Sequence, residues 1–155
     1  MKHKNLSSQE KDNGEEKLVK LHAEARLVEN FRIDVDDRRA HVVPLDLAPP
    51  DGKDMGPSAL ELCLMSFAGC YAAIFILTVQ KMRFRLKNLE IKVDAVKSEQ
   101  LGTITEVTAD ILVEADMPKD RILRAHELTV KDCPVGILFE RANVKIKYNV
   151  RNGKE

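Results

Sequence analysis

One uncharged stretch in the middle of the chain constrains the fold more than any other feature. Residues 62–79 carry no charged side chain and are mostly apolar. Their length meets the lower threshold for a membrane-spanning helix, about 18 residues. The stretch nevertheless includes serine, threonine, glycine, tyrosine and two cysteines, and segments that alternate between apolar and polar residues surround it. We therefore expect a helix that is apolar on all sides and buried inside a soluble protein, in a position suited to a dimer core.

Local signals at both ends set the limits of this helix. Pro57 precedes Ser58, and Ser58 with Glu61 fits a capping box, in which each side chain satisfies a backbone donor at the helix start. At the other end, Lys81 and a following arginine suit the negative end of the helix dipole. The sequence predicts a helix from about Pro57 to Met82.

Alternation with a period of two predicts three strands before the helix. Residues 21–27 and 31–35 alternate between apolar and polar side chains, and the Glu29-Asn30 pair between them suits a tight hairpin turn. A third strand is expected over residues 41–47. Prolines and glycines then predict a loop over residues 48–56.

The second half of the chain predicts two further strands, a helix with a short continuation, and a last strand. Residues 89–95 and 107–113 alternate between apolar and polar side chains, and they are expected to pair as a hairpin across a turn around Leu101-Gly102. Asp116 and Pro118 open a helix that should end near Asp132, since the residue before a proline disfavours the helical conformation. Pro134 suits the first position of a short third helix. Residues 144–150 alternate between apolar and polar side chains and form the last predicted strand.

The element order is three strands, a long helix, two strands, a helix with its continuation, and a strand. This order predicts an α+β fold with antiparallel pairing, for which no parallel strand–helix–strand unit is needed. Residues 17–150 form the single predicted domain. Residues 1–16, rich in charged and polar side chains, are expected to be a disordered tail, and residues 151–155 a C-terminal tail.

Composition excludes several classes of function. Lys plus Arg equal Asp plus Glu at 25 each, so no net charge favours nucleic acid or an anionic membrane as a partner. Three cysteines without a CxxC pair argue against a secreted disulfide framework and against structural zinc. The N-terminus has no apolar signal segment. We expect a cytoplasmic protein with no cofactor, no metal, no nucleic-acid partner and no membrane partner.

The three cysteines differ in their surroundings. Cys70 lies in the apolar helix, where it is either a small core residue or a nucleophile, and burial disfavours its thiolate unless a cation is close. Cys133 precedes Pro134, so its sulfur would lie near the positive end of a helix, although a capping or loop role is equally open. His126 on the preceding helix is expected to be solvated, with a contact to Cys133 left open.

Cys63 precedes Cys70 by seven residues. On a regular helix the two share one face but are separated by about 10 Å of rise, whereas a disulfide needs α-carbons within about 7 Å. Cys63 is therefore expected to be a packing residue. A redox pair, if the chain has one, joins Cys70 to Cys133.

Three segments together resemble the OsmC/Ohr family, the osmotically inducible and organic hydroperoxide resistance proteins. They are GPSALEL at residues 56–62, FAGC at residues 67–70 and CPV at residues 133–135. The expected element order also agrees with that family over roughly residues 17–150. The resemblance implies antiparallel sheets wrapped around a long central helix in an intertwined homodimer, with active sites at the subunit interface.

The resemblance also implies an activity, the thiol-dependent reduction of organic hydroperoxides or hydrogen peroxide. By this analogy Cys70 matches the peroxidatic cysteine and Cys133 the resolving cysteine. The partners would be a second copy of the chain, a small hydroperoxide substrate and an external dithiol reductant. An arginine would lower the pKa of the first thiol, and a carboxylate would orient that arginine.

Glu61 and Arg39 are the candidates for these two assisting roles. The best-characterised branch of the family has an acidic residue directly after the proline, where this chain has Ser58. Glu61 precedes Cys70 by about two and a half helical turns, so the two side chains point to opposite sides of one helix. Glu61 can serve the site only from a partner subunit or a distorted helix, whereas a capping role needs neither. The branch's glycine-rich loop with its arginine is not recognisable, which leaves Arg39 as the candidate, because Arg26 and Arg32 occupy polar strand positions.

Two classes of function remain open. The first is a thiol peroxidase. The second is a stress, small-molecule-binding or redox-sensing protein of the same fold, in which Cys70 and Cys133 are retained without catalytic turnover. A small membrane-associated module, suggested by the apolar run alone, ranks last.

Overall fold

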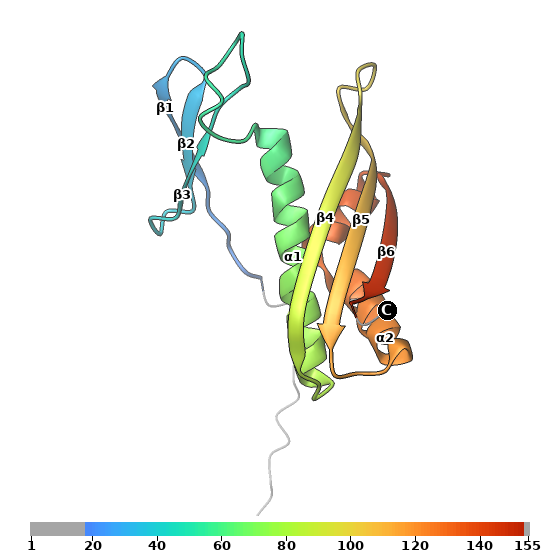
Figure 1. Cartoon of the computed structure of the whole chain (residues 1–155). Coiled ribbons are helices and arrows are strands. Elements are labelled where there is room, and N and C mark those ends of the chain that lie inside the picture. The colour runs from blue at the N-terminus through green and yellow to red at the C-terminus, as the bar shows by residue number, and fades with distance from the viewer. Residues whose placement is uncertain (1–17, 154–155) are drawn as a thin grey trace, which may run out of the picture.

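The computed structural model describes residues 18–153, so the expected N-terminal tail, residues 1–16, lies outside the described residues. The described chain forms two three-stranded sheets and three helices (Figure 1). The elements in order are β1 (Glu24–Glu29), β2 (Arg32–Asp36), β3 (Val42–Leu45), α1 (Ala59–Lys81), β4 (Leu86–Ser98), β5 (Thr103–Ala115), α2 (Lys119–Asp132), α3 (Pro134–Arg141) and β6 (Lys145–Asn152). The predicted α+β class and element order are confirmed.

The N-terminal sheet is an antiparallel meander in the order β1-β2-β3. The predicted hairpin turn is present, and Asn30 adopts a positive φ of 51° there, a conformation that asparagine tolerates better than most residues. A register shift between Leu27 and Glu29 marks an irregularity next to the turn. Strand β1 begins three residues later than predicted, at Glu24, and β3 is shorter than expected at both ends.

The start of α1 follows the predicted capping chemistry. The Ser58 hydroxyl accepts a hydrogen bond from the Glu61 backbone N–H at 3.3 Å, and the Ser58 N–H donates to the Glu61 carboxylate at 2.7 Å. Upstream, the buried carboxylate of Asp46 accepts backbone hydrogen bonds from Leu47, Lys53 and Met55, which organises the loop that leads into the helix. The sequence-predicted limits of the helix are correct to within two residues.

The C-terminal sheet has the order β4-β5-β6 and differs from prediction in one pairing. Strands β4 and β5 form the expected antiparallel hairpin, and Gly102 adopts a φ of 70° at its turn. Strands β5 and β6, however, are parallel, so the expectation of antiparallel pairing throughout was wrong. Helices α2 and α3 fill the connection and return the chain to the end of the sheet from which β5 started, which makes the next strand parallel. Strand β6 also continues to Asn152, beyond the predicted domain limit at residue 150.

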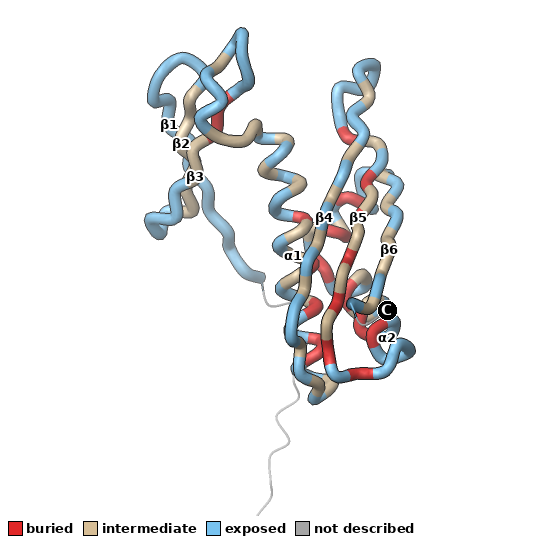
Figure 2. Tube along the Cα trace, in the orientation of Figure 1, coloured by how far each residue is buried: buried red, intermediate tan, exposed pale blue. Residues whose placement is uncertain are grey.

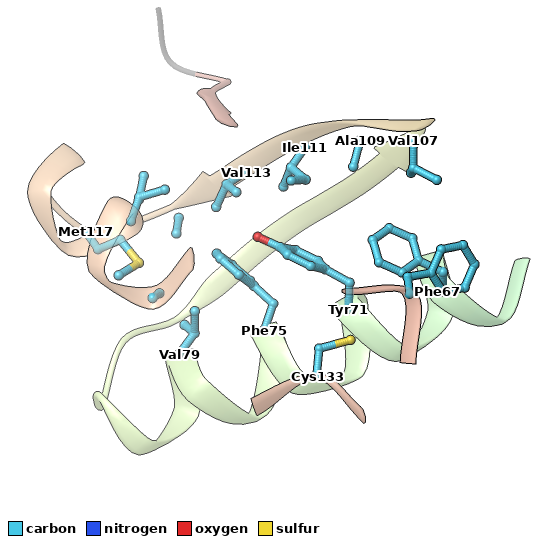
Figure 3. Close-up of a cluster of buried hydrophobic side chains, with 14 of the residues drawn as sticks. Phe67, Tyr71, Phe75, Val79, Val107, Ala109, Ile111, Val113, Met117 and Cys133 are labelled. Atoms are coloured by element: carbon cyan, nitrogen blue, oxygen red, sulfur yellow. The ribbon is translucent and has the colours of Figure 1, made fainter. Parts of the chain in front are cut away.

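Helices α1, α2 and α3 cover one face of the C-terminal sheet, and the core lies between them (Figures 1 and 2). Alternate residues of β5 point into this core, and side chains one turn apart on α1 point toward them (Figure 3). The residues concerned are Val107, Ala109, Ile111 and Val113 on β5 and Phe67, Tyr71, Phe75 and Val79 on α1. The spacing of two on the strand and of four on the helix brings two apolar faces together.

Only one side of α1 is buried within the single chain, so the expected burial on all sides would require a second copy. Met65, Ile76 and Leu77 on the other side are 56%, 39% and 49% exposed. The chain supplies one sheet to cover this helix, because the N-terminal sheet stands apart from it (Figure 1). By length and composition α1 could cross a membrane, but its aromatic face packs against β5 as a core helix does.

Candidate thiol site

The fold brings Cys70 and Cys133 together from two separate elements. Cys70 lies in the middle of α1, and Cys133 lies between α2 and α3 with an extended backbone conformation that ends one helix and starts the next. Their sulfur atoms are 3.3 Å apart, and the Cys133 S–H donates toward the Cys70 sulfur. Both cysteines are free thiols. The predicted pair is therefore adjacent in space although 63 residues separate its members in sequence.

Cys133 is buried, and its thiol has a raised pKa. Its side chain is 1% exposed, and the Gly136 backbone N–H donates to its sulfur at 3.4 Å. Burial raises the pKa of Cys133 to about 11; the Gly136 N–H opposes this rise, and the neighbouring Cys70 adds to it. The sequence correctly placed this sulfur at a helix start. A thiolate is nevertheless disfavoured there, because the loss of hydration exceeds what the backbone N–H groups restore.

Cys70 is the more open member of the pair. Cys70 is only partly buried, whereas Cys133 is 1% exposed and belongs to the buried cluster drawn in Figure 3. Cys70 is therefore the more exposed residue of the two. Cys63, expected to be a packing residue, is instead exposed on α1 and lines a shallow surface groove.

An aromatic cluster with one histidine adjoins the thiol pair. The Tyr71 hydroxyl and His126 Nδ1 are 2.7 Å apart, and the ring of Tyr148 lies 5.9 Å from that of Tyr71 and 5.1 Å from that of His126. Burial lowers the pKa of His126, partly offset by Glu127. His126 was expected to be solvated, and that expectation was wrong. The one available signal was its helical position, two turns before Cys133.

Glu61 lies at the start of α1 and caps the helix. Its carboxylate is exposed and accepts hydrogen bonds from the Ser58 hydroxyl and the Ser58 N–H, each at 2.7 Å. These hydrogen bonds, the hydroxyl's first, hold the pKa of Glu61 below its usual range. Within the chain, the structure gives Glu61 the capping geometry and keeps it on its own helix end rather than beside Cys70.

Arg39 lies in the connection between β2 and β3, in the sheet that stands apart from α1. Its guanidinium is exposed and pairs with Asp37 at 2.6 Å. On the neighbouring strand, Arg32 has a buried Nε that has no hydrogen-bond partner among residues 18–153. The Arg39 guanidinium is thus paired with Asp37. The Arg32 guanidinium, on a polar strand position, has an Nε without a hydrogen-bond partner among the described residues.

No group of three or more His, Cys, Asp or Glu side chains within residues 18–153 is arranged to hold a metal ion. The chemistry available at the site is that of two thiols and the hydroxyl and imidazole beside them. An oxidant that accepts two electrons can convert two thiols in contact into a disulfide after a small movement, because the disulfide needs a sulfur separation of about 2.05 Å.

Comparisons with known proteins agree with the fold. The Escherichia coli K12 protein YhfA is 25% identical over 134 residues, covering 84% of this chain and 98% of YhfA. The crystal structure of an OsmC-like protein from Mycoplasma pneumoniae superimposes with a TM-score of 0.79 at 19% identity, over 86% of this chain and 97% of that one. The organic hydroperoxide resistance protein OhrB of Bacillus subtilis superimposes with a TM-score of 0.61 at 17% identity, over 87% and 100%.

A family model described as OsmC-like protein matches residues 51–149. The matched region runs from the loop before α1 into β6 and includes both Cys70 and Cys133. It covers more than half of the chain. On this evidence the chain belongs to the OsmC-like protein family.

Proposed function

We propose that the protein is a thiol-dependent peroxidase that reduces organic hydroperoxides or hydrogen peroxide, with Cys70 as the peroxidatic and Cys133 as the resolving cysteine. The observation that carries this proposal is the 3.3 Å separation of the two sulfur atoms. The difference in exposure supports the assignment of roles, because the peroxide must reach the first sulfur and not the second. The family, which includes organic hydroperoxide resistance proteins among the structural relatives, supports the class of substrate.

The proposed cycle uses the two thiols in turn. The Cys70 thiolate attacks one peroxide oxygen, the O–O bond breaks, and Cys70 becomes a sulfenic acid, while the departing alkoxide or hydroxide takes a proton from solvent and leaves as an alcohol or water. The Cys133 sulfur then attacks the Cys70 sulfur, which forms a disulfide and releases water. An external dithiol reduces the disulfide and is itself oxidised to a disulfide. This use of an external dithiol suits the cytoplasm, where thiols are kept reduced.

A homodimer is part of the proposal, because the single chain leaves two apolar surfaces uncovered. One is the outer side of α1, and the other is the N-terminal sheet, where Leu27 is 72% and Phe31 49% exposed. Contiguous apolar surface of this kind marks an interface. Exchange of the N-terminal sheets between two copies would cover the outer side of each α1.

The cation that the mechanism needs would come with this exchange. A buried cysteine reacts slowly unless a positive group stabilises its thiolate. Arg39 is a weak candidate because Asp37 already pairs with it. Arg32 is the better candidate, because its buried Nε lacks a hydrogen-bond partner among the described residues. In a dimer, the sheet that carries Arg32 would lie over the partner's α1.

Steady-state turnover of cumene hydroperoxide and of hydrogen peroxide with a dithiol tests the proposal. We expect Cys70→Ser to abolish turnover and Cys133→Ser to permit one stoichiometric oxidation of Cys70 without turnover. Cys63→Ser is the matched control, a cysteine on the same helix, and should leave turnover unchanged. Arg32→Ala should slow the first oxidation more than Arg39→Ala.

The rival function, a redox-sensing or small-molecule-binding protein, predicts a different result. It allows the disulfide to form stoichiometrically with an oxidant but without repeated turnover at any dithiol concentration. That outcome with the intact chain would contradict the peroxidase proposal. Two observations favour this rival. Glu61 caps its own helix, and the guanidinium of Arg39 is already paired with Asp37.

A further inference from the structure

The hydrogen bond between Tyr71 and His126 adjoins the thiol pair but has no part in the reaction proposed above. Tyr71 directly follows Cys70 on α1, and His126 lies on α2, the helix that ends at Cys133. The 2.7 Å contact between the Tyr71 hydroxyl and His126 Nδ1 therefore links the two elements that carry the two sulfurs.

We propose that Tyr71 and His126 are positioning residues, whose hydrogen bond fixes α1 against α2 and so holds the Cys70 and Cys133 sulfurs within reach of disulfide formation. The inference rests on the proposed Cys70–Cys133 pairing. Both residues lie outside the three segments that resemble the family: Tyr71 directly follows FAGC, and His126 lies on α2.

The surroundings of Tyr71 show that its hydroxyl is held and not merely accommodated. The side chain is 1% exposed, and its ring stacks between Phe75 at 6.0 Å and Tyr148 at 5.9 Å. A phenylalanine would fill this apolar space equally well. A buried hydroxyl costs free energy unless it has a partner, and the described partner is His126 on the other helix.

The link lies close to the sulfurs along both helices. On α1 it is one residue from Cys70, and on α2 the side chain of His126 lies two turns before Cys133, on nearly the same side of the helix. The sulfurs, at 3.3 Å, need to approach by little more than 1 Å to reach the disulfide separation of about 2.05 Å. Loosening α1 against α2 would enlarge the volume in which the two thiols move and lower their effective concentration toward each other.

The measurable quantity is the equilibrium of the protein dithiol with glutathione. In this exchange Cys70 and Cys133 lose two electrons and two protons and form one disulfide bond, while one glutathione disulfide is cleaved to two glutathione molecules. The equilibrium constant gives the effective concentration of the two thiols. It does not depend on peroxide turnover.

We would measure this constant in the full-length chain carrying Cys63→Ser, which removes the exposed third thiol. Tyr71→Phe removes only the hydroxyl, and His126→Leu removes its imidazole partner. His126→Asn places an amide oxygen near the position of Nδ1 and tests rescue. Thr129→Val is the matched control, because Thr129 is a buried residue of the same helix whose hydroxyl bonds within that helix, to the Ala125 carbonyl at 2.8 Å.

We expect Tyr71→Phe and His126→Leu each to lower the constant about tenfold, a rise of about 30 mV in reduction potential for this two-electron couple. The double variant should lower it no further than either single variant, and His126→Asn should restore most of the loss. Thr129→Val should change the constant less than twofold even if it lowers stability.

Equal effects of Thr129→Val and Tyr71→Phe, additive effects in the double variant, or an unchanged constant in both single variants would overturn the inference. A chain that forms the disulfide with glutathione, responds to these variants as expected and yet turns over no peroxide would contradict the peroxidase proposal and support the positioning role. A chain that forms no Cys70–Cys133 disulfide would overturn both.

Discussion

Cys133 illustrates how two local effects compete at a single atom. The start of α3 offers a backbone N–H from Gly136 to the sulfur, which by itself favours the thiolate. The same sulfur is 1% exposed, and the loss of hydration favours the neutral thiol more strongly. The neutral thiol is therefore the favoured form of Cys133, which is compatible with the proposed resolving role.

The Cys133 thiol should titrate far above the usual range. In a Cys63→Ser/Cys70→Ser variant only Cys133 remains, and burial, the largest cause of its raised pKa, is retained. We expect its thiolate absorbance to rise with a midpoint well above about 8.5, the usual value for a cysteine. A midpoint at or below that value would show that the helix start dominates over burial.

His126 should make stability depend on pH in the acid range. Burial lowers its pKa in the folded state, so as the pH falls below about 6.5 the unfolded chain takes up a proton that the folded chain does not. The contribution of His126 to the free energy of unfolding is thus present above that pH and is lost below it.

The comparison of the parent with His126→Asn isolates this effect. We expect the advantage of the parent in free energy of unfolding to shrink between about pH 7.5 and pH 5.5. Denaturant titrations of both proteins at one protein concentration measure it. A constant or growing advantage toward low pH would mean that the folded state protonates His126 readily.

At the scale of elements, the start and the middle of α1 have different roles. Its start is fixed by Ser58 and Glu61, which satisfy each other's backbone donors, and its middle carries Cys70 on the side that meets α2 and α3. A well-fixed start limits fraying of the first turn and keeps the long helix in register with the sheet it covers.

The capping box separates a structural role of Glu61 from a catalytic one. Ser58→Ala should lower the free energy of unfolding by about 1 kcal/mol, the usual cost of losing such a cap. Glu61→Gln should leave both stability and peroxide turnover nearly unchanged, because glutamine also completes a capping box. Loss of turnover in Glu61→Gln with unchanged stability would instead assign the carboxylate charge to the site.

At the scale of the whole molecule, a single chain leaves two apolar surfaces exposed. Met65 and Leu77 on α1 are about half exposed, as are Phe31 and Val42 on the N-terminal sheet. The two surfaces belong to parts of the chain that stand apart in Figure 1. A second copy can cover both surfaces with the same pair of contacts repeated, as two-fold symmetry requires.

Leu77→Glu should therefore shift the protein from dimer to monomer, because it places a charge within the proposed interface. Sedimentation equilibrium measures the change. Leu123→Glu is the matched control, since Leu123 is a leucine of similar exposure, 44% against 49%, on helix α2. A monomeric parent, or a dimer unaffected by Leu77→Glu, would contradict this interface.

Much of the fold could be predicted because its signals are local. The limits of α1 follow from a capping box and a basic last turn, and the strands follow from alternation, all within a few neighbouring residues. The candidate thiol pair could be named for a different reason, the resemblance of three short segments to a family. Helical spacing alone excluded a disulfide between Cys63 and Cys70, but it could not show that Cys70 and Cys133 are close in space.

Tertiary structure decided the rest, because these features depend on groups that are distant in the chain. The parallel direction of β6 depends on the path of α2 and α3, and alternation is the same for a strand of either direction. The bond from His126 to Tyr71 and the high pKa of Cys133 depend on which elements close over them. The sequence by itself determined which segments are helix and strand and which thiols are candidates; the packing of α1 against α2 decided that two of those thiols meet, since only the fold controls distance and hydration.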